Sequence, residues 1–172
     1  MNTPRIAIFF LAVPALIACG SHAASASAWS VKIHVDQMTG DKYIYAVDAA
    51  KSPLTTYLGM KETVRLILGC SAPGTTPTMM LSTDVVINGD IINNIHPTNI
   101  RFDKNKEFKW NLSALSGGNG YIFNNSVQLL RNGSSARRML IQFTTEPSGQ
   151  QKILDFNIVG MPDVLNHMHC KA

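Results

Sequence analysis

The sequence has few charged residues, only three cysteines and, beyond its first segment, no long hydrophobic run. Charged residues make up 15% of the 172 residues, against about 25% in an average soluble protein. Hydrophobic residues make up 45%, which excludes intrinsic disorder, because disordered chains have few apolar and many charged residues. The abundance of Asn, Ser, Thr and Gly excludes a coiled coil. The length favours a single domain.

Signatures of catalysis and of cofactor binding are also missing. The chain has no Gly-x-Ser-x-Gly motif, and its scattered acidic residues assign no carboxylate pair. Residues 117–120 share only their glycine-rich composition with a phosphate-binding loop, because no Lys-Ser or Lys-Thr follows them. His167, His169 and Cys170 are ligand types that suit zinc, but on a helix the two histidines point about 200° apart. We therefore predict no catalytic residue, no metal and no cofactor.

The first segment has the features of a bacterial export signal. Arg5 precedes a 13-residue apolar run, residues 6–18, which is too short for a membrane span of about 20 residues. We predict that residues 1–18 are a signal peptide, which extends as far as residue 28 if cleavage occurs at the later sites. No later apolar run approaches the length of a span.

The cleavage site has two interpretations. Residues 16–19, Leu-Ile-Ala-Cys, have the form of a lipobox, which predicts a lipid on Cys19 and a Ser/Ala-rich tether over residues 19–28. This interpretation makes the protein a lipoprotein anchored to the outer membrane. The second interpretation is ordinary signal peptidase cleavage between small residues, after Ala23, Ala26 or Ala28, which makes it a soluble protein of the bacterial periplasm.

Two cysteines remain once Cys19 is lipidated or removed. Cys70 and Cys170 are an even pair in an exported protein, and exported proteins fold in an oxidising compartment. We predict a disulfide between them, which closes a loop of about 100 residues and attaches the C-terminal segment to the middle of the fold. The alternative is two free, buried thiols.

The chain after the tether alternates apolar and polar residues at the period of β-strands. The segment 29–35, with Trp29, Val31 and Ile33 on one side, is expected to bury that face. Tight turns such as Asn88-Gly89 separate many of the segments, which indicates antiparallel pairing. We expect about eight strands, drawn from residues 29–35, 42–47, 62–70, 78–87, 91–95, 99–103, 107–112, 138–144 and 152–159.

Two short helices complete the prediction. Asn124 or Asn125 is expected to cap the first, which Asn132-Gly133 closes. Pro162 suits the first turn of the second, over residues 162–169. The predicted fold class is mainly β (α+β): an antiparallel β-sandwich or half-barrel with two short helices, one of them C-terminal, in a single domain over residues 29–172.

An ordered set of short motifs extends over about residues 29–170. The motifs are a Trp-led strand at Trp29 followed by Asp-Gln-Met-Thr-Gly-Asp at 36–41, a strand ending in Cys70, Arg-Phe-Asp at 101–103 before Trp110, and Phe-Asn-Ile-Val-Gly at 156–160 before Cys170. This order resembles the VasI/TagO family of type VI secretion accessory proteins. The chain departs from the family at Gln37, where the family often has Pro, and in its long Asn/Gly-rich middle. The resemblance implies an envelope location and an accessory role in secretion, and it supplies no catalytic residue.

Three residues within these motifs are candidates for a partner-facing surface. Arg101 and Asp103 are two residues apart in one predicted strand, so they point to the same face. We favour a structural ion pair between them, with a partner-facing patch as the alternative. Trp110 is expected in the core, with a ligand platform as the alternative. Five basic residues are expected to form a solvated face, with lipid head groups or anionic glycans as alternative ligands: Lys104, Lys106, Lys109, Arg137 and Arg138.

Three classes of function are compatible with these features. The leading hypothesis is a non-enzymatic envelope protein that binds a secretion component as a type VI secretion accessory. The second is a periplasmic inhibitor or immunity protein against a lysozyme-like or toxin enzyme, with the loop at residues 113–120 as its plug. The third, an envelope hydrolase, lacks a visible nucleophile–base pair. None of the three needs nucleic acid, and the membrane is reached only through a lipid on Cys19.

Overall fold

The described part of the chain is rich in β-strands. The computed structural model describes residues 29–35, 37, 38, 40, 42–56 and 58–171. The predicted signal peptide and tether, including Cys19, lie outside the described residues. Within the described residues, no helix is long and apolar enough to cross a membrane. The strands are β1 (Ser30–Val35), β2 (Lys42–Ala49), β3 (Leu54–Thr55), β4 (Lys61–Glu62), β5 (Arg65–Cys70), β6 (Thr78–Ser82), β7 (His96–Phe102), β8 (Phe108–Ala114), β9 (Gly120–Phe123), β10 (Arg138–Thr144) and β11 (Gln151–Asn157), and the helices are α1 (Ser126–Asn132) and α2 (Met161–His167).

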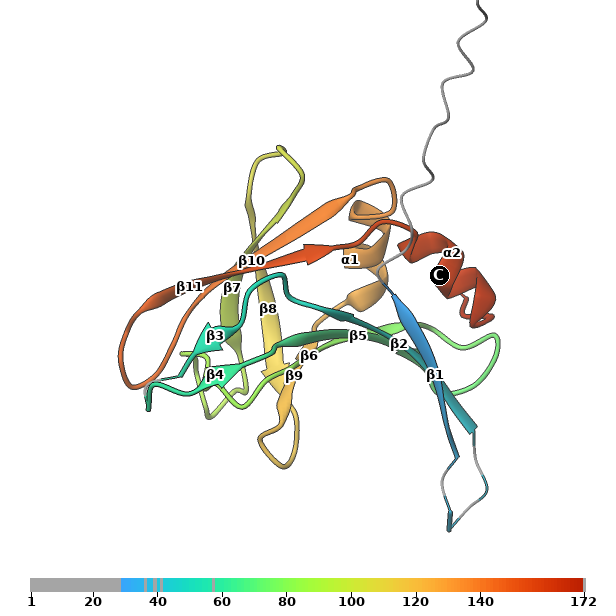
Figure 1. Ribbon diagram of the computed structural model, residues 1–172, viewed down its shortest axis with the longest axis horizontal. Coiled ribbons are helices and arrows are strands. Elements are labelled where there is room, and N and C mark those ends of the chain that lie inside the picture. Colours follow the sequence, from blue (N-terminus) through green and yellow to red (C-terminus); the bar gives the residue numbers. More distant parts are fainter. Residues whose placement is uncertain (1–28, 36, 39, 41, 57, 172) are drawn as a thin grey trace, which may run out of the picture.

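Nine of these strands form one antiparallel sheet in the order β1-β2-β5-β6-β9-β8-β7-β10-β11, and β3 pairs with β4 in a small separate sheet. The large sheet curves until β11 contacts β2, without closing into a barrel (Figure 1). Both short helices lie at one end of the molecule, and the β3–β4 pair lies at the other (Figure 1). The predicted fold class, mainly β and antiparallel with two short helices, is confirmed.

The core is made by the alternating side chains that the curved sheet turns inward. Leu66 and Leu68 of β5 face Met139 and Ile141 of β10 within one cluster of buried residues, and all four are fully buried. β10 follows the predicted segment 138–144 without a shift, with its even-numbered positions less buried than its odd ones. A strand with this pattern needs a second layer over one face, and the curvature of the sheet supplies that layer.

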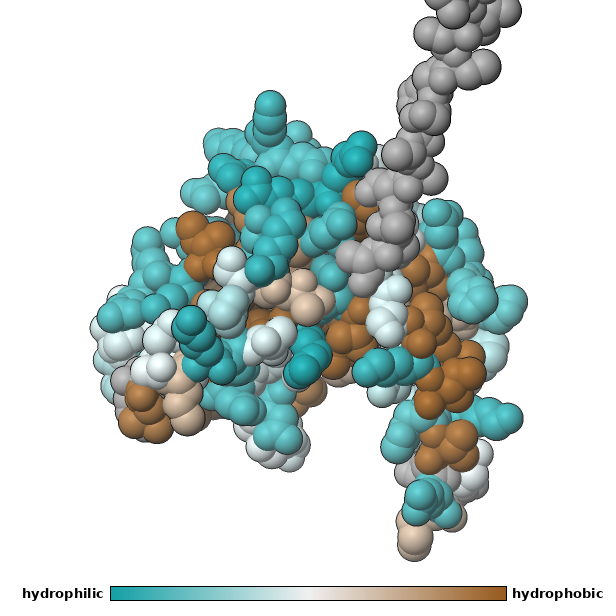
Figure 2. Space-filling model, viewed as in Figure 1, coloured by the Kyte–Doolittle hydropathy of each residue, from teal (hydrophilic) through white to brown (hydrophobic). Residues whose placement is uncertain are grey.

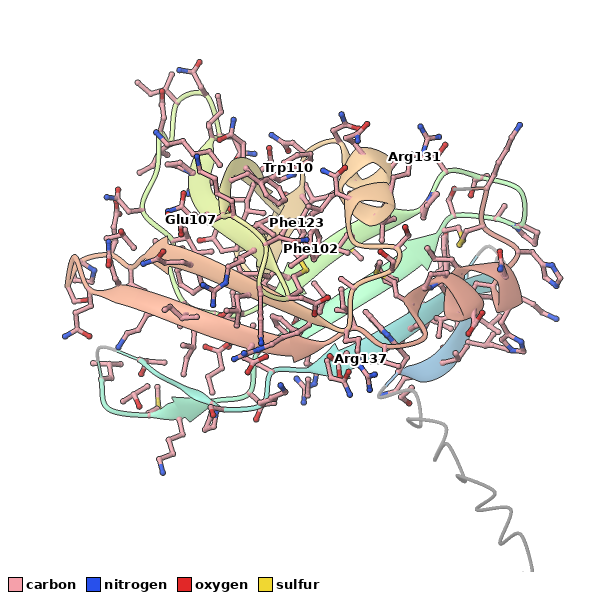
Figure 3. The ribbon with its side chains drawn as sticks, turned by 90° about the horizontal axis from the view of Figure 1, so that it is seen from above. Phe102, Glu107, Trp110, Phe123, Arg131 and Arg137 are labelled. Carbon is pink, nitrogen blue, oxygen red and sulfur yellow. A yellow bond between two sulfur atoms is a disulfide. The ribbon has the colours of Figure 1, made fainter. Side chains whose placement is uncertain are left out.

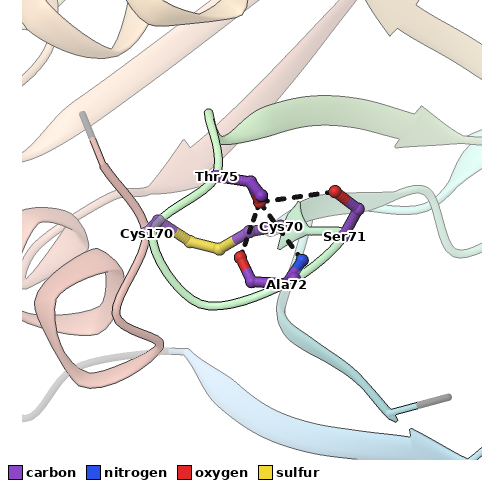
Figure 4. The surroundings of a disulfide bond; sticks show 5 residues. All are labelled: Cys70, Ser71, Ala72, Thr75 and Cys170. Carbon is purple, nitrogen blue, oxygen red and sulfur yellow. Dashed lines mark hydrogen bonds between the residues drawn. A yellow bond between two sulfur atoms is a disulfide. The ribbon is translucent and has the colours of Figure 1, made fainter.

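The predicted disulfide between Cys70 and Cys170 is present, with a Cα–Cα distance of 5.9 Å (Figure 4). It joins the end of β5 to the segment that follows α2. Backbone bonds run between the same two segments: the Gly74 amide donates to the His169 carbonyl at 2.7 Å, and the Lys171 amide donates to the Thr75 carbonyl at 2.9 Å. The C-terminal segment is therefore attached to the middle of the fold, as the sequence predicted.

A second long-range connection joins β2 to β11, and we call it the β2–β11 seam. The Lys51 amide donates to the Asp155 carbonyl at 2.9 Å, and the Lys51 ammonium lies 3.1 Å from the Asp155 carboxylate. Arg138 holds the same carboxylate with two hydrogen bonds, of 2.9 and 2.8 Å. Asp48, which is only 5% exposed, accepts hydrogen bonds from the backbone of Ala49 and of Asn157 in β11. The edge of β11 is thus covered by the chain that leaves β2.

The two carboxylates of the seam have pKa values shifted in opposite directions. Burial raises the pKa of Asp48 from 3.8 to about 6, although its backbone hydrogen bonds and Lys51 act in the other direction. Partial burial also acts to raise the pKa of Asp155, but hydrogen bonds from Arg138 and Lys51 outweigh it and lower that pKa. The ion pairs are half exposed, so each stabilises the fold by about 1 kcal/mol or less.

The buried face expected of the first strand is found only at its start, since Trp29, just before β1, is buried in the core. All six residues of β1 are exposed, although the alternation of Val31, Ile33 and Val35 is that of a half-buried strand. The physical reason is the position of the seam. Because β11 meets β2 rather than β1, the first strand lies outside the two facing halves of the sheet and no second layer covers it (Figure 1).

Two predictions for the middle of the chain are also wrong. The segment 78–87 forms a strand only to Ser82, residues 91–94 form turns rather than a return strand, and Ile95 makes only an isolated β-bridge to Asp90. The Asp90 side chain closes this loop locally, since it accepts hydrogen bonds from the Asn93 amide at 3.1 Å and from the Asn93 side chain at 2.6 Å. Ile91 and Ile92 are left exposed, and apolar residues without a buried face do not stabilise a strand.

Other differences concern short elements. β3 and β4 were not predicted, and Gly120, expected in a loop, begins β9. A Cβ atom at Gly120 would collide with the Leu81 carbonyl, so this glycine permits close pairing with β6. Asn125 stands at the N-cap of α1 but makes no side-chain cap bond. Its φ of 51° differs from the extended conformation that a capping side chain needs.

Removing the disulfide should destabilise the fold. The bridge closes a loop of 100 residues, for which chain entropy gives about 4.7 kcal/mol, and we expect a loss of about 2–5 kcal/mol. Equilibrium urea unfolding of the Cys70→Ala/Cys170→Ala variant measures it. Dithiothreitol should lower the unfolding midpoint of the wild type to a similar extent and leave that of the variant unchanged. A wild-type midpoint that is insensitive to reductant contradicts the prediction.

Replacing Asp48 by Asn tests the cost of burying its charge. Its pKa rises on folding from 3.8 to about 6, so this group stabilises the fold fully below about pH 4, and the contribution is lost as pH rises through about 6. At 1.36 kcal/mol per pKa unit, the loss is roughly 1–3 kcal/mol. As the pH rises from about 4 to about 7, we expect the free energy of unfolding of Asp48→Asn to increase by that amount relative to the wild type, as measured by urea unfolding.

Asp155→Asn is the matched contrast in the same seam. The pKa of Asp155 is lowered, so its stabilisation is present above the usual carboxyl pKa and is lost as pH falls through the lowered value. The Asp155→Asn variant should therefore be destabilised most at neutral pH, opposite in sign to Asp48→Asn. Equal pH profiles for Asp48→Asn and the wild type would show that the Asp48 charge is not buried at a cost.

Candidate functional site

A groove at the β3–β4 end of the molecule is the candidate site. Its volume is about 410 Å³, within the range of about 300–1,000 Å³ typical of ligand sites. Three segments that are distant in sequence form its walls: the β3–β4 turn, the chain after β6, and the β10–β11 turn. The lining residues are Thr55, Thr56, Leu58, Met60, Asp84, Val85, Val86, Thr145, Glu146, Ser148, Gln150 and Lys152.

Hydrogen bonds hold two of the walls against each other. The Glu146 amide donates to the Val86 carbonyl at 2.9 Å, and Ile87 forms a β-bridge with Thr145. Within the β10–β11 turn, the Gly149 amide donates to the Thr145 carbonyl at 2.8 Å. The β10–β11 turn and the chain after β6 therefore form one joined surface.

The third wall is joined to the second by a side chain. Glu62 of β4 accepts a hydrogen bond of 2.9 Å from the Asp84 amide. In the β3–β4 turn, the Thr56 amide donates to the Met60 carbonyl at 2.8 Å, and the Thr56 hydroxyl accepts from the Met60 amide at 3.2 Å. This turn holds Leu58 and Met60 at the mouth of the groove.

Behind the groove, a buried tyrosine supports the chain after β6. The Tyr121 hydroxyl accepts a hydrogen bond of 2.8 Å from the Ile87 amide and donates to the Val85 carbonyl at 3.4 Å. Burial and, to a smaller degree, the negative charge of Glu146 raise the pKa of Tyr121 above its usual value of 10. The phenol therefore stays protonated and serves as a fixed donor and acceptor.

The lining of the groove suits binding of an amphipathic element. Leu58, Met60 and Val86 are exposed apolar side chains, which gain free energy when a partner covers them. Threonine and serine hydroxyls lie between them, and Asp84 and Glu146 add negative charge. Figure 2 shows hydrophobic residues among hydrophilic ones at this end. Ligand-binding sites usually combine apolar surface with a small number of polar groups.

Among the described residues, the side chains whose types suit metal binding do not come together. His96 is buried beside Tyr121, with ring centroids 5.0 Å apart, and its Nδ1 bonds the Ile87 carbonyl at 2.7 Å. The imidazole thus has a structural role. In the described part of the chain, no group of three His, Cys, Asp or Glu residues converges to hold a metal. Cys170 is in the disulfide, and His169 is exposed beyond the end of α2.

The seam carboxylates also have a structural role. A pair of acids with pKa values shifted in opposite directions is a feature of acid–base catalysts, and Asp48 and Asp155 form such a pair. Neither of them lines the groove. Asp48 is almost fully buried, and the Asp155 carboxylate is occupied by Arg138 and Lys51.

The expected ion pair between Arg101 and Asp103 is wrong. β7 ends at Phe102, and Asp103 has a φ of 49°, so the two side chains no longer share the face of one strand. The Asp103 carboxylate instead accepts hydrogen bonds of 3.1 and 2.9 Å from the backbone amides of Arg137 and Arg138. Arg101 is exposed on the outer face of β7. Their partner-facing role stays a prediction.

Trp110 is half-buried against the core, close to its expected position. Its indole N–H donates to the Asn124 carbonyl at 2.7 Å, and its ring packs edge-to-face against Phe108 at 5.9 Å. In Figure 3, Trp110 and Glu107 lie well apart from Arg137. None of Arg101, Asp103 and Trp110 lines the groove.

The residues of the groove were not predicted from the sequence. They come from three turns, and one wall includes the cis Glu146-Pro147 peptide. The one available signal was the pair of apolar residues, Leu58 and Met60, inside an otherwise polar turn. The expected plug at residues 113–120 comprises the end of β8, a turn over residues 115–119 and the first residue of β9, and the Leu115 amide donates to the Gly120 carbonyl at 2.9 Å.

Known proteins supply no relative with which to compare this groove. No protein-family model, no curated protein and no solved structure matches the chain. The groove, the disulfide and the exposed apolar side chains are therefore the features from which a function has to be inferred.

Proposed function

We propose that this chain is an exported protein of the bacterial envelope that binds a protein partner and catalyses no reaction of its own. The observation that carries the proposal is the groove, which presents Leu58, Met60 and Val86 to solvent beside hydroxyl and carboxylate groups. An apolar side chain of the partner fills it, and the polar groups orient that side chain. We propose a type VI secretion component as the partner, on the ordered motifs that resemble the VasI/TagO family.

The envelope location is supported by two independent features. The N-terminal apolar run ends in a lipobox-like sequence at residues 16–19. A disulfide that closes most of the domain is typical of proteins that fold in an oxidising compartment. On this proposal, Cys19 carries the lipid and residues 20–28 lead from the outer membrane to β1.

The intact mass of the protein extracted from bacterial envelopes tests the N-terminus. We expect a chain that begins at Cys19 and carries acyl groups, with two hydrogens lost to the Cys70–Cys170 bond. The Cys19→Ser variant should lose the acyl mass and leave the membrane fraction. An unlipidated chain that begins after Ala23, Ala26 or Ala28 contradicts the lipoprotein and leaves a soluble periplasmic protein. A chain with an intact N-terminus contradicts export.

Capture of partners from envelope extracts tests the groove. A Leu58→Asp/Met60→Asp variant places two charges in the apolar mouth, and we expect it to lose at least about tenfold in partner affinity, since 1.4 kcal/mol corresponds to a factor of ten. The matched control is Ile91→Asp/Ile92→Asp, because these two isoleucines are at least as exposed, 80% and 95% against 64% and 60% for Leu58 and Met60, but lie outside the groove. Circular dichroism checks that both variants fold.

The identity of the captured protein decides between the two classes of binder. Recovery of a secretion component that depends on Leu58 and Met60 supports the accessory role. Recovery of only a glycan hydrolase or a toxin enzyme would overturn that role in favour of an inhibitor or immunity protein. Capture that both variants retain would mean that the groove is not the binding site.

A further inference from the structure

The two edges of the large sheet are treated differently. The β11 edge is covered at the seam by Lys51. Among the described strands, β1 pairs with β2 alone, and all six of its residues are exposed. The β1–β2 hairpin projects from the body, away from both helices (Figure 1). An open edge strand presents unpaired backbone donors and acceptors to another strand.

The free edge also has an apolar face. Val31, Ile33 and Val35 are exposed and lie on one side of β1. Ala46 and Ile44 of β2 lie opposite Val31 and Ile33 and belong to the core side of the sheet, whereas the exposed Lys42 lies opposite Val35. Thus β1 continues the core-facing surface of the sheet beyond the point where a second layer ends. Figure 2 shows this row of hydrophobic residues along the projecting hairpin.

The sequence of β1 is symmetric in its chemistry. Residues 31–35 are apolar, basic, apolar, basic, apolar, and Ile33 is at the centre. An antiparallel pair of two such strands centred on Ile33 places Ile33 opposite Ile33 and Val31 opposite Val35. It places Lys32 opposite His34, so no two lysines face each other. Cross-strand apolar pairs stabilise a sheet, and directly opposed like charges destabilise it.

We propose that β1 pairs with β1 of a second copy of this chain, antiparallel and centred on Ile33, in a two-fold symmetric dimer. The interface is isologous, as a two-fold axis requires, because each residue at position n meets the residue at 66 minus n of the other copy. The six apolar side chains then form one patch on the same face of a continuous sheet. The strand contains no proline and no bulge that would block this pairing.

A second copy fits this edge better than an unrelated strand does. A heterologous partner needs no symmetry in β1, whereas an isologous pair needs the palindromic order that residues 31–35 have. One six-residue strand buries a small interface, so we expect a weak dimer, with a Kd of roughly micromolar to millimolar. A lipid anchor would raise the effective concentration at the membrane, but the pairing does not depend on one.

Sedimentation equilibrium of the purified protein tests the pairing. Because the interface is expected to be weak, the protein concentration has to extend to about 1 mM. The Ile33→Glu variant should raise the dimer Kd at least about tenfold, because it opposes two carboxylates at the centre of the interface. The matched control is Ile153→Glu. Ile153 is 61% exposed, against 66% for Ile33, but it lies on β11, and its replacement should leave the Kd unchanged.

Disulfide trapping tests the register, in a Cys19→Ser background that removes the third cysteine. On the two-fold axis, position 33 meets itself at a Cα separation of about 4.5–5.5 Å, within the range of a disulfide. Ile33→Cys should therefore form a linked dimer on mild oxidation. Val31→Cys alone should not, but a mixture of Val31→Cys with Val35→Cys should, because these positions meet across the axis.

The outcomes are distinct. A wild-type protein that stays monomeric to about 1 mM overturns the proposal. A dimer that Ile33→Glu does not weaken, or that Ile153→Glu weakens equally, is built on another surface and also overturns it. A linked dimer from Val31→Cys alone, with none from Ile33→Cys, overturns the register centred on Ile33.

Discussion

The contact between β2 and β11 is the constraint on which the rest of this structure depends. A nine-stranded antiparallel sheet with one apolar face has to cover that face. Here the sheet does so by curving back on itself until β11, the last strand in the sheet order, contacts β2. The bonds of Lys51 to Asp155 and of Asp48 to the Asn157 backbone hold this meeting point. Their individual free energies are small, so most of the stabilisation comes from the apolar side chains that the curved sheet buries.

The position of the seam explains two features at opposite ends of the molecule. Because β11 meets the second strand, β1 extends past the closed part and its apolar face stays exposed. At the other end, turns between strands lie at the edge of the sheet, and the β3–β4 pair and the β10–β11 turn form walls of the groove. The disulfide and both helices occupy the end near the hairpin (Figure 1). The buried Asp48 carboxyl lies in this seam, where burial raises its pKa.

Local sequence patterns predicted the parts of this fold whose partners are close in the chain or chemically unambiguous. The period-two alternation of residues 138–144 predicted β10 with both of its ends. Cys70 and Cys170 are the two cysteines that follow the predicted signal peptide and tether, and two cysteines allow only one intramolecular bridge. Burial of β1 was predicted wrongly, because alternation indicates that a strand can bury a face and not that another layer reaches it. The groove was missed because its walls come from turns, whose side chains have no periodicity, and because those turns are distant in sequence and meet only in the folded chain.

The two surfaces that this fold leaves open are compatible with each other. The groove lies at the β3–β4 end, and the β1–β2 hairpin lies at the opposite end (Figure 1). Pairing through β1 would therefore leave the grooves of both copies accessible and would point them away from the two-fold axis. Two weak sites on one dimer bind a repetitive partner more tightly than either site alone, through effective concentration.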